Sequence, residues 1–239
     1  MNSENINKIY ELSENYDKCQ DKVEKQRIEK ELKELLAPFK KGSIGLAQIN
    51  PIVGDIEYNA QKVVENIVHA QNIGLDLVVF PELILMGYPI EDTIDRHPII
   101  VSENVKWLKE IAKITTQTTA LVGFVEPRKP DHLTGKKYYN SVAILGEGKI
   151  QGIIRKSLLP TYSEFNDYRY IEPSPVVGVQ PENTLGDFDE DSVVTCNKTS
   201  SINNIKYGIS ICEDCWNNKE FFNEMTMYSK DPIEELSQE

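Results

Sequence analysis

After residue 42, short apolar runs alternate along the chain with longer segments in which apolar and polar positions are mixed. Three apolar runs have the length of strands, and they are residues 43–49, 75–80 and 119–126. Between them, residues 59–74 have apolar positions at helical spacing, with Asn59 as the expected N-cap and Gly74 at the end, and residues 101–113 predict a second helix. Strand, helix, strand, helix and strand in this order predict an α/β layer with helices packed on a sheet.

The pattern then changes to two adjacent strands. Residues 138–145 and 149–156 are strand-like and flank the turn sequence GEG, so we expect a hairpin and an antiparallel part of the sheet. The second strand of this hairpin ends at Lys156.

The C-terminal third begins with a loop-rich, acidic region at residues 173–192. A short strand, VVTC, and a polar turn at residues 197–204 follow, and a last strand at residues 206–211 leads to Cys212. At the end of the chain, Asp231 as N-cap, followed by proline, predicts the start of a helix. Only a few residues follow, so we expect the chain to be a fragment or a truncated gene product.

The N-terminal region has a different composition. Residues 4–37 are rich in Glu and Lys, have apolar residues at helical spacing and end at the sequence APFKKG. We therefore divide the chain into a helical extension at residues 1–42 and one domain at residues 43–239. The extension has either a solvated or oligomer-facing role or a regulatory one.

Charge and apolar content limit the classes of partner. The net charge of −12 over 239 residues disfavours nucleic acids and anionic membrane surfaces, which are bound by Lys and Arg. The sequence has no signal-peptide pattern at its start and no apolar run of membrane-spanning length. We expect a cytoplasmic protein with a small-molecule or protein partner.

The cysteines call for a separate explanation. Cys19, Cys196, Cys212 and Cys215 are too few and too unevenly spaced for a disulfide framework. Cys212 and Cys215 have the Cys-x-x-Cys spacing of a metal or redox pair, but there is no second such pair and the histidines are scattered. Cys212 could also be a buried packing residue or a nucleophile.

Three reactive residues follow predicted strands, and they are Glu82, Lys156 and Cys212. Ligands of α/β sheets bind beyond the carboxyl ends of strands, so these residues can converge although they are distant in sequence. A thiol is mostly protonated at neutral pH and needs a base, which Glu82 could supply, while Lys156 could support a thiolate and a developing oxyanion. Each residue alone has an ordinary structural explanation, as a turn carboxylate, a solvated lysine or a packed thiol.

The sequence around these residues resembles a known family. PELILMGYPIED (81–92), RKSLLPTYSEF (155–165) and ISICEDCW (209–216) are similar to the Glu, Lys and Cys motifs of the carbon-nitrogen hydrolase (nitrilase) superfamily. More narrowly, AQINPIVGDIEYNA, GYPIED, YYNSVAIL and ICEDCW resemble the glutaminase domain of glutamine-dependent NAD(+) synthetases. One departure is YSEFND, where many family members have a tyrosine, a glycine and VFDE.

The resemblance implies a fold and a role for each matched residue. The fold is a nitrilase-type α-β-β-α sandwich, here expected to be C-terminally incomplete. Cys212 is the nucleophile, Glu82 the general base and Lys156 the group that stabilises the oxyanion, while Glu164 helps to orient the lysine and the substrate. The residues that the resemblance places in or around the substrate pocket are Tyr88, Tyr162, Asp167, Glu213 and Trp216, of which the two tyrosines could equally be packing residues.

The same resemblance implies glutamine hydrolysis through a Cys thioester, with ammonia passing to an ATP-dependent domain that amidates deamido-NAD(+). Neither a Walker loop nor the SGGxDS loop of that second domain occurs in this chain. We therefore expect no cofactor or metal in this domain, and ATP and Mg²⁺ only in a missing synthetase domain of the same polypeptide. We also expect a homo-oligomer. The alternatives are a free-standing amidase on another small amide or nitrile, or a non-catalytic truncated interaction protein.

Overall fold

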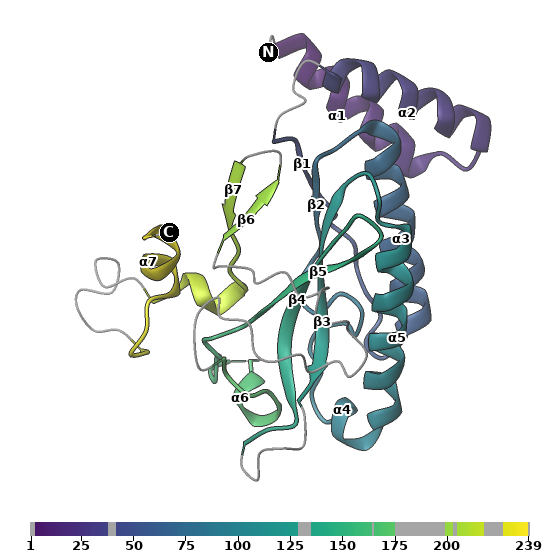
Figure 1. Cartoon of the computed structure of the whole chain (residues 1–239). Helices are drawn as coiled ribbons and strands as arrows, with labels where there is room; N and C mark the ends of the chain where they lie inside the picture. Colours follow the sequence, from purple (N-terminus) through teal and green to yellow (C-terminus); the bar gives the residue numbers. More distant parts are fainter. Residues whose placement is uncertain are drawn as a thin grey trace.

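The structure is a computed structural model, and it describes residues 3–37, 42–128, 135–163, 165–174, 199–202, 205–217 and 227–238. Its centre is a five-stranded sheet with the strand order β1-β2-β3-β4-β5 (Figure 1). The strands are β1 (Ile44–Leu46), β2 (Leu77–Val79), β3 (Thr119–Pro127), β4 (Tyr138–Gly146) and β5 (Lys149–Arg155). The first three are parallel and the last three antiparallel, and the antiparallel pairing of β4 with β5 is the hairpin that the sequence predicts.

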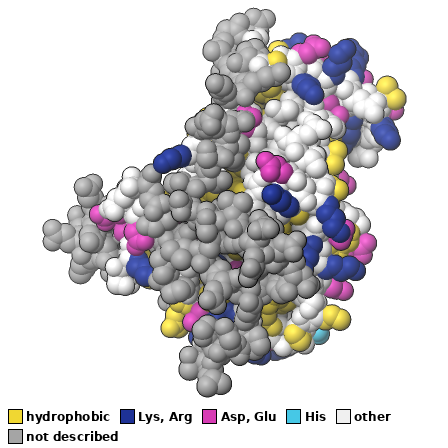
Figure 2. All heavy atoms as spheres, viewed as in Figure 1, with side chains coloured by type: hydrophobic (Ala, Val, Ile, Leu, Met, Phe, Trp, Pro, Cys, Tyr) yellow, Lys and Arg dark blue, Asp and Glu magenta, His cyan; other side chains and the backbone are white. Residues whose placement is uncertain are grey.

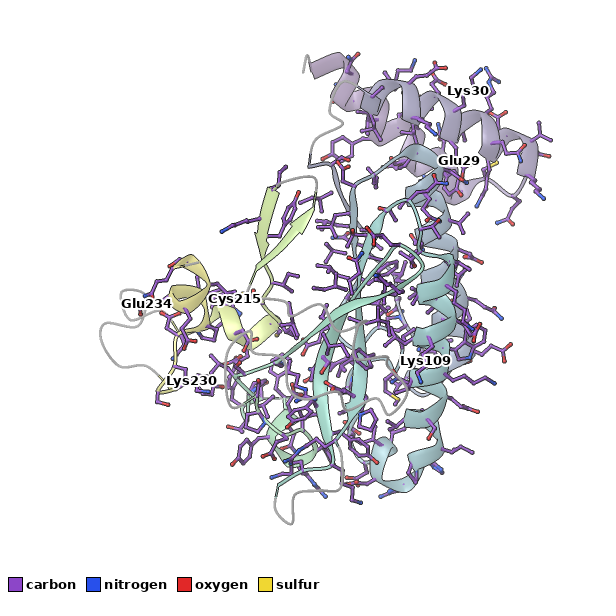
Figure 3. All side chains as sticks on the ribbon, in the orientation of Figure 1. Glu29, Lys30, Lys109, Cys215, Lys230 and Glu234 are labelled. Atoms are coloured by element: carbon purple, nitrogen blue, oxygen red, sulfur yellow. The ribbon has the colours of Figure 1, made fainter. Side chains whose placement is uncertain are left out.

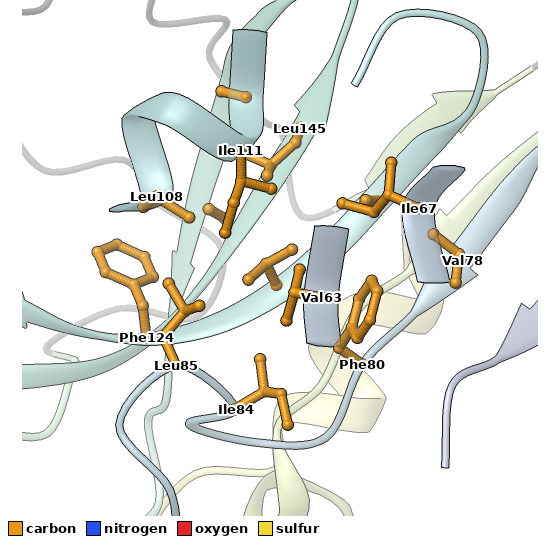
Figure 4. Packing of buried hydrophobic residues seen from close by; sticks show 14 of the residues in the cluster. Val63, Ile67, Val78, Phe80, Ile84, Leu85, Leu108, Ile111, Phe124 and Leu145 are labelled. Atoms are coloured by element: carbon orange, nitrogen blue, oxygen red, sulfur yellow. The ribbon is translucent and has the colours of Figure 1, made fainter. Parts of the chain in front are cut away.

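One face of this sheet packs against two long helices, α3 (Ile56–Ile73) and α5 (Pro98–Ile114). Side chains alternate between the faces of a strand, so Val78 and Phe80 point to these helices while Leu77 points away. Figure 4 shows the resulting core, in which side chains of the sheet and of both helices meet. The labelled residues of this core are Val63, Ile67, Val78, Phe80, Ile84, Leu85, Leu108, Ile111, Phe124 and Leu145.

The opposite face of the sheet is covered in part by a two-stranded sheet, β6 (Thr199–Ile202) and β7 (Ile205–Gly208). Tyr207 and Ile209 pack against a buried cluster of that face, whose members are Leu77, Leu121, Ile144 and Ile154. On the far side of the small sheet lies α7 (Pro232–Ser237), whose Leu236 approaches Gly208. The described residues therefore form a helical layer, the five-stranded sheet and a small second sheet on its other face.

The N-terminal region forms two helices, α1 (Ser3–Lys18) and α2 (Lys22–Leu36), rather than the single helix that the sequence pattern suggests. The chain turns at residues 19–21, where the Asp21 side chain accepts a hydrogen bond from the Glu24 N–H and caps α2. Ile28 and Leu32 of α2 are buried together with Ile73 of α3. The helical hairpin formed by α1 and α2 therefore shares a hydrophobic cluster with the α/β layer.

Of three local predictions, one is confirmed, one is wrong and one is wrong in part. The N-cap of α3 is Asp55, which accepts from the Tyr58 N–H, so the assignment of Asn59 is wrong. Asn59 lies inside the helix, buried, and exchanges hydrogen bonds with the backbone of Ile52. Gly74 ends α3 in the left-handed conformation with φ 81°, as predicted. The expected polar turn at residues 197–204 is also wrong in part, because it contains β6.

The shorter elements are α4 (Thr93–Arg96), α6 (Asp167–Tyr170) and a 3-10 helix, η3 (Cys212–Cys215). Asp231 caps α7 by accepting from the N–H groups of Ile233 and Glu234, as predicted. No helix among the described residues is long and apolar enough to cross a membrane. On the face shown in Figure 2, positive and negative side chains are interspersed over the helices, and neither sign forms a continuous patch there.

Candidate active site

Glu82 lies in the segment that follows β2 and crosses over β3 at Gly123. A Cβ at position 123 would lie 2.4 Å from the Leu83 nitrogen and 2.8 Å from the Pro81 oxygen, so only glycine permits this approach. Leu83 itself has a left-handed φ of 51°. The chain therefore turns sharply at Glu82, and its carboxylate points toward the ends of β4 and β5.

Lys156 comes directly after β5 and is buried, with 1% of the residue exposed. Its Nζ donates to Glu82 Oε1 at 2.7 Å and to Asp167 Oδ2 at 2.8 Å. Burial lowers the pKa of Lys156, but the two carboxylates outweigh this effect and raise the pKa above its usual value. The ammonium is therefore charged at neutral pH, as a group that supports negative charge must be.

Cys212 is the first residue of η3 and has a left-handed φ of 47°. The prediction that it ends a strand is wrong, because β7 ends at Gly208. A non-glycine residue in this conformation is strained, which is a frequent property of residues at functional sites. Cys212 as a whole residue is exposed, but its thiol is partly enclosed near Glu82.

The thiol of Cys212 lies close to the Glu82 carboxylate, near enough for its charge to act on the thiol. Burial and the negative charge of Glu82 raise the pKa of the Cys212 thiol to about 11, and the charge of Lys156 offsets only part of this increase. The resting pair at neutral pH is therefore a neutral thiol and a carboxylate. Such a thiol needs a base to become a nucleophile, and Glu82 is the carboxylate that lies close to it.

Asp214 joins the two segments that hold Lys156 and Cys212. Its carboxylate accepts from the N–H groups of Ser157 and Leu158, which follow Lys156, and from the Ile211 N–H, which precedes Cys212. Burial raises the pKa of Asp214 to about 6, and the backbone hydrogen bonds limit the increase. Sequence reasoning missed this residue, because its role depends on backbone groups that no side-chain motif encodes.

The residues predicted for the substrate pocket lie around this centre. Glu213 is buried and accepts from Tyr162 OH at 2.7 Å and from Tyr228 OH at 2.9 Å. Tyr88 OH donates to Asp167 Oδ1 at 3.0 Å, so both oxygens of Asp167 are already bound by protein groups. Trp216 is 54% exposed at the end of η3. Glu164 lies outside the described residues.

Asn140 and Tyr228 contact the predicted site residues but carry no role in the sequence analysis. Asn140 lies in the motif YYNSVAIL on β4, and its Nδ2 donates to Glu82 Oε1 at 2.6 Å. The sequence could have signalled Asn140 only through this motif. Tyr228 is distant from all three motifs and offers no such signal.

The second cysteine of the Cys-x-x-Cys sequence has a different environment. Cys215 is exposed at the other end of η3, in the turn beside α7, and its Sγ lies 3.0 Å from Ser210 Oγ (Figure 3). Among the residues that the structure describes, no group of three or more His, Cys, Asp or Glu side chains is arranged to hold a metal ion.

A cavity of about 390 Å³ adjoins the Tyr88–Asp167 pair. It is lined mostly by polar and charged residues, which are Tyr88, Pro89, Ile90, Glu91, Asp92, Ser163, Asn166, Asp167, Arg169 and Tyr170. Its size is that of a site for a small molecule.

Comparison with known proteins places the chain in a family. The profile of the carbon-nitrogen hydrolases matches residues 43–227, which contain Glu82, Lys156 and Cys212. The chain belongs to the carbon-nitrogen hydrolase family. The glutamine-dependent NAD(+) synthetase of Thermotoga maritima is 37% identical to this carbon-nitrogen hydrolase over 181 residues, and that of Synechocystis sp. is 33% identical over 197 residues.

These matches cover 75% and 81% of the chain but only 27% and 31% of the two relatives, so the chain spans less than a third of their length. Among solved structures, the glutamine-dependent NAD+ synthetase of Acinetobacter baumannii superposes with a TM-score of 0.61 at 28% identity, over 82% of this chain and 30% of that one. An amidase of Nesterenkonia sp. AN1 superposes with a TM-score of 0.54 at 15% identity, over 77% of this chain and 61% of that one, a likeness of fold. The α/β sandwich fold of this carbon-nitrogen hydrolase is thus confirmed.

Proposed function

We propose that this chain is the glutaminase part of a glutamine-dependent NAD(+) synthetase, which hydrolyses the side-chain amide of glutamine and releases ammonia. The observation that carries the proposal is the convergence of a thiol and an ammonium on one carboxylate, in Cys212, Lys156 and Glu82. The relatives that match over most of the chain are NAD(+) synthetases, which supports glutamine as the amide.

The first half of the reaction is acyl transfer to sulfur. Glu82 takes the thiol proton while the sulfur of Cys212 attacks the amide carbon, and the carbonyl electrons move to oxygen. The charged Lys156 stabilises this oxyanion. Glu82 then gives the proton to the amide nitrogen, and the carbonyl re-forms as the C–N bond breaks. Ammonia departs, and the acyl group remains on Cys212 as a thioester.

The second half returns the protein to its starting state. A water molecule gives a proton to Glu82 and attacks the thioester carbon, and the C–S bond then breaks. The departing sulfur takes the proton back from Glu82, which leaves glutamate and a neutral thiol. Tyr162 and Glu213, which are hydrogen-bonded to each other beside Cys212, form part of the wall for the glutamyl group. Tyr88, Asp167 and Trp216 are proposed for the same pocket, with Asp167 acting through Lys156.

The ammonia would be used by an ATP-dependent domain that amidates deamido-NAD(+), as the resemblance to the glutaminase domain of NAD(+) synthetases implies. ATP and Mg²⁺ would be bound by that domain and not by the residues described here. We propose that it belongs to the same full-length polypeptide, that the assembly is a homo-oligomer, and that it works in the cytoplasm. Glu164 is proposed as the second glutamate of the site.

The test is ammonia release from glutamine by the 239-residue chain and by its Cys212→Ala variant. We expect the variant to lose at least a thousandfold in rate, because no other group can form the thioester. Cys215→Ala is the matched control and should keep the rate of the unmodified chain. Equal ammonia release by Cys212→Ala would contradict the proposal, and faster turnover of a simple amide such as acetamide than of glutamine would favour a free-standing amidase.

A further inference from the structure

Asn140 is the second nitrogen donor on Glu82. It is 1% exposed, and its Nδ2 lies 2.6 Å from Glu82 Oε1, the same oxygen that accepts from Lys156 Nζ at 2.7 Å. Neither nitrogen donates to Oε2. Two donors on one oxygen fix the rotation of a carboxylate, because any turn of its plane would break both hydrogen bonds.

We infer that Asn140 is a positioning residue, which holds the Glu82 carboxylate in the orientation in which it can act on the thiol of Cys212. This inference rests on the role of Glu82 as the base in the proposed function. Asn140 itself touches neither the thiol nor the reacting amide, and it acts through Glu82.

The side-chain amide of Asn140 donates a hydrogen bond to Glu82 at one end but accepts none at the other from the part of the chain that the structure describes. Its Oδ1 is buried and has no hydrogen-bond partner among the described residues. Turning the amide over would place Oδ1 against the carboxylate, where two acceptors repel each other, so Nδ2 must face Glu82. A buried acceptor without a partner is unfavourable, and such groups in folded proteins call for an explanation. Here the explanation is the donor that the other end of the amide supplies to Glu82.

The backbone of Asn140 adds a second link to the site. Its carbonyl oxygen accepts from the Lys156 N–H at 2.9 Å, which extends the pairing of β4 with β5 by one bond. The side chains of Asn140 and Lys156 thus extend from neighbouring positions of the two strands, and both donate to Glu82 Oε1. Residue 140 therefore sets the position of Glu82 relative to Lys156.

The test compares Asn140→Ala and Asn140→Asp with the unmodified chain, with the rate of Cys212 alkylation by iodoacetamide as readout. Mass spectrometry separates Cys212 from the other cysteines. Without this donor the Glu82 carboxylate can turn away from the thiol and takes its proton less readily, so we expect alkylation at pH 7 to slow about tenfold in Asn140→Ala, equal to about one pKa unit. The added negative charge of Asn140→Asp should slow it further. A structural defect alone would not shift the pH at which the alkylation rate rises.

Asn104→Ala is the matched control, because Asn104 is also fully buried and donates from Nδ2, but to the backbone oxygen of Val125. It should lower the melting temperature without changing the pH dependence of alkylation. If Asn140→Ala does not fold, the nearly isosteric Asn140→Asp remains for the comparison. The inference is overturned if the folded variants alkylate Cys212 within twofold of the unmodified chain at every pH.

The ammonia assay distinguishes the two proposals. A chain that releases no ammonia from glutamine but shows the alkylation shift would refute the proposed function and keep the role of Asn140. A chain that hydrolyses glutamine, and whose Asn140→Ala variant keeps both kcat and the pH profile, would keep the function and refute the role. We expect kcat to fall about tenfold or more and KM to change little, because Asn140 acts on the base and not on the substrate.

Discussion

The charges of Glu82, Asp167 and Lys156 determine whether the Cys212 thiol is protonated before substrate binds. Glu82 and Asp167 together carry two negative charges, and Lys156 between them carries one positive charge. The remaining negative charge and the partial burial of Cys212 keep its thiol protonated, with a pKa of about 11. The site therefore does not store a thiolate, which would be open to oxidation and alkylation. In the proposed mechanism, the thiolate forms only when Glu82 accepts the proton during attack.

Asp214 gives a prediction on the pH dependence of stability. Its pKa is raised from 3.8 to about 6 in the folded chain, so the folded state binds this proton more tightly than the unfolded state. The contribution to stability is complete below about pH 4 and is lost as the pH rises through 6, by about 3 kcal/mol in all. Thermal melting between pH 4 and 7 should show the Asp214→Asn variant gaining stability relative to the unmodified chain as the pH rises. A constant difference between the two would contradict this assignment.

The sequence is sufficient to bring together the residues that we propose to react, but not to identify those that hold them. Glu82 and Lys156 were placed together because each follows a strand in a recognisable motif, and the structure has them 2.7 Å apart. The contact of Asp167 with Lys156 depends on how the chain after β5 folds back, and spacing alone cannot give that. The same holds for Asp214, whose partners are backbone N–H groups.

At the scale of elements, β5 is fixed next to the site by a buried ion pair. Arg155, the residue before Lys156, donates from Nε and Nη2 to both oxygens of Glu126 on β3, and Ser141 on β4 donates to the same carboxylate. The Arg155 guanidinium also lies over the ring of Tyr139, 3.7 Å from its centroid. Three adjacent strands are thereby joined where the antiparallel half of the sheet reaches the site.

Removal of Glu126 should therefore destabilise the fold strongly. Glu126→Ala leaves the Arg155 charge buried, at 3% side-chain exposure, without its carboxylate, and we expect a loss of about 3–5 kcal/mol in the free energy of unfolding. Glu110→Ala, which removes one partner of an exposed pair with Lys113, is the control and should cost less than about 1 kcal/mol. Urea unfolding of both variants measures the difference. Similar losses in the two variants would show that the buried pair contributes no more than a surface pair.

The prediction of elements succeeded where apolar periodicity was strong and failed at their boundaries. The hairpin of β4 and β5 has a clear alternation around a turn, and it was placed correctly. The N-cap of α3 was assigned to Asn59 because the helical pattern is clear only from there, whereas Asp55 caps it one turn earlier. The polar sequence of β6 gives no apolar alternation at all, so pairing with β7 determines this strand.

At the scale of the whole molecule, the N-terminal hairpin is joined to the α/β layer by polar contacts as well as by its apolar cluster. Glu29 of α2 lies where Figure 3 shows the hairpin meeting α3, and it accepts from Tyr16 OH and from Asn72 Nδ2. The ring of His69 stacks on Tyr16 with centroids 3.8 Å apart, and its Nδ1 lies 3.4 Å from Glu29 Oε1. A histidine of α3 is thus enclosed by the α1–α2 hairpin.

These contacts predict that the hairpin loosens as the pH falls. Burial lowers the pKa of His69, and this effect outweighs the attraction of Glu29 and Asp17 for the protonated ring, while the nearby Lys25 lowers the pKa further. The docked hairpin therefore favours the neutral ring, so its stability is complete above about pH 6.5 and is lost as the pH falls below that value. Hydrogen exchange, corrected for the intrinsic effect of pH, should show α1 and α2 losing protection between pH 7.5 and 5.5 while β3 and β4 keep theirs.

The variant His69→Gln removes the titrating group and should make the protection of α1 and α2 independent of pH over this range. His97→Gln, at an exposed histidine outside this contact, should retain the pH dependence of the unmodified chain. Equal loss of protection in His69→Gln and in the unmodified chain would show that another group controls the docking. A separate loosening of the hairpin would leave Glu82, Lys156 and Cys212 in place, because the hairpin's apolar cluster with α3 contains no residue of that site.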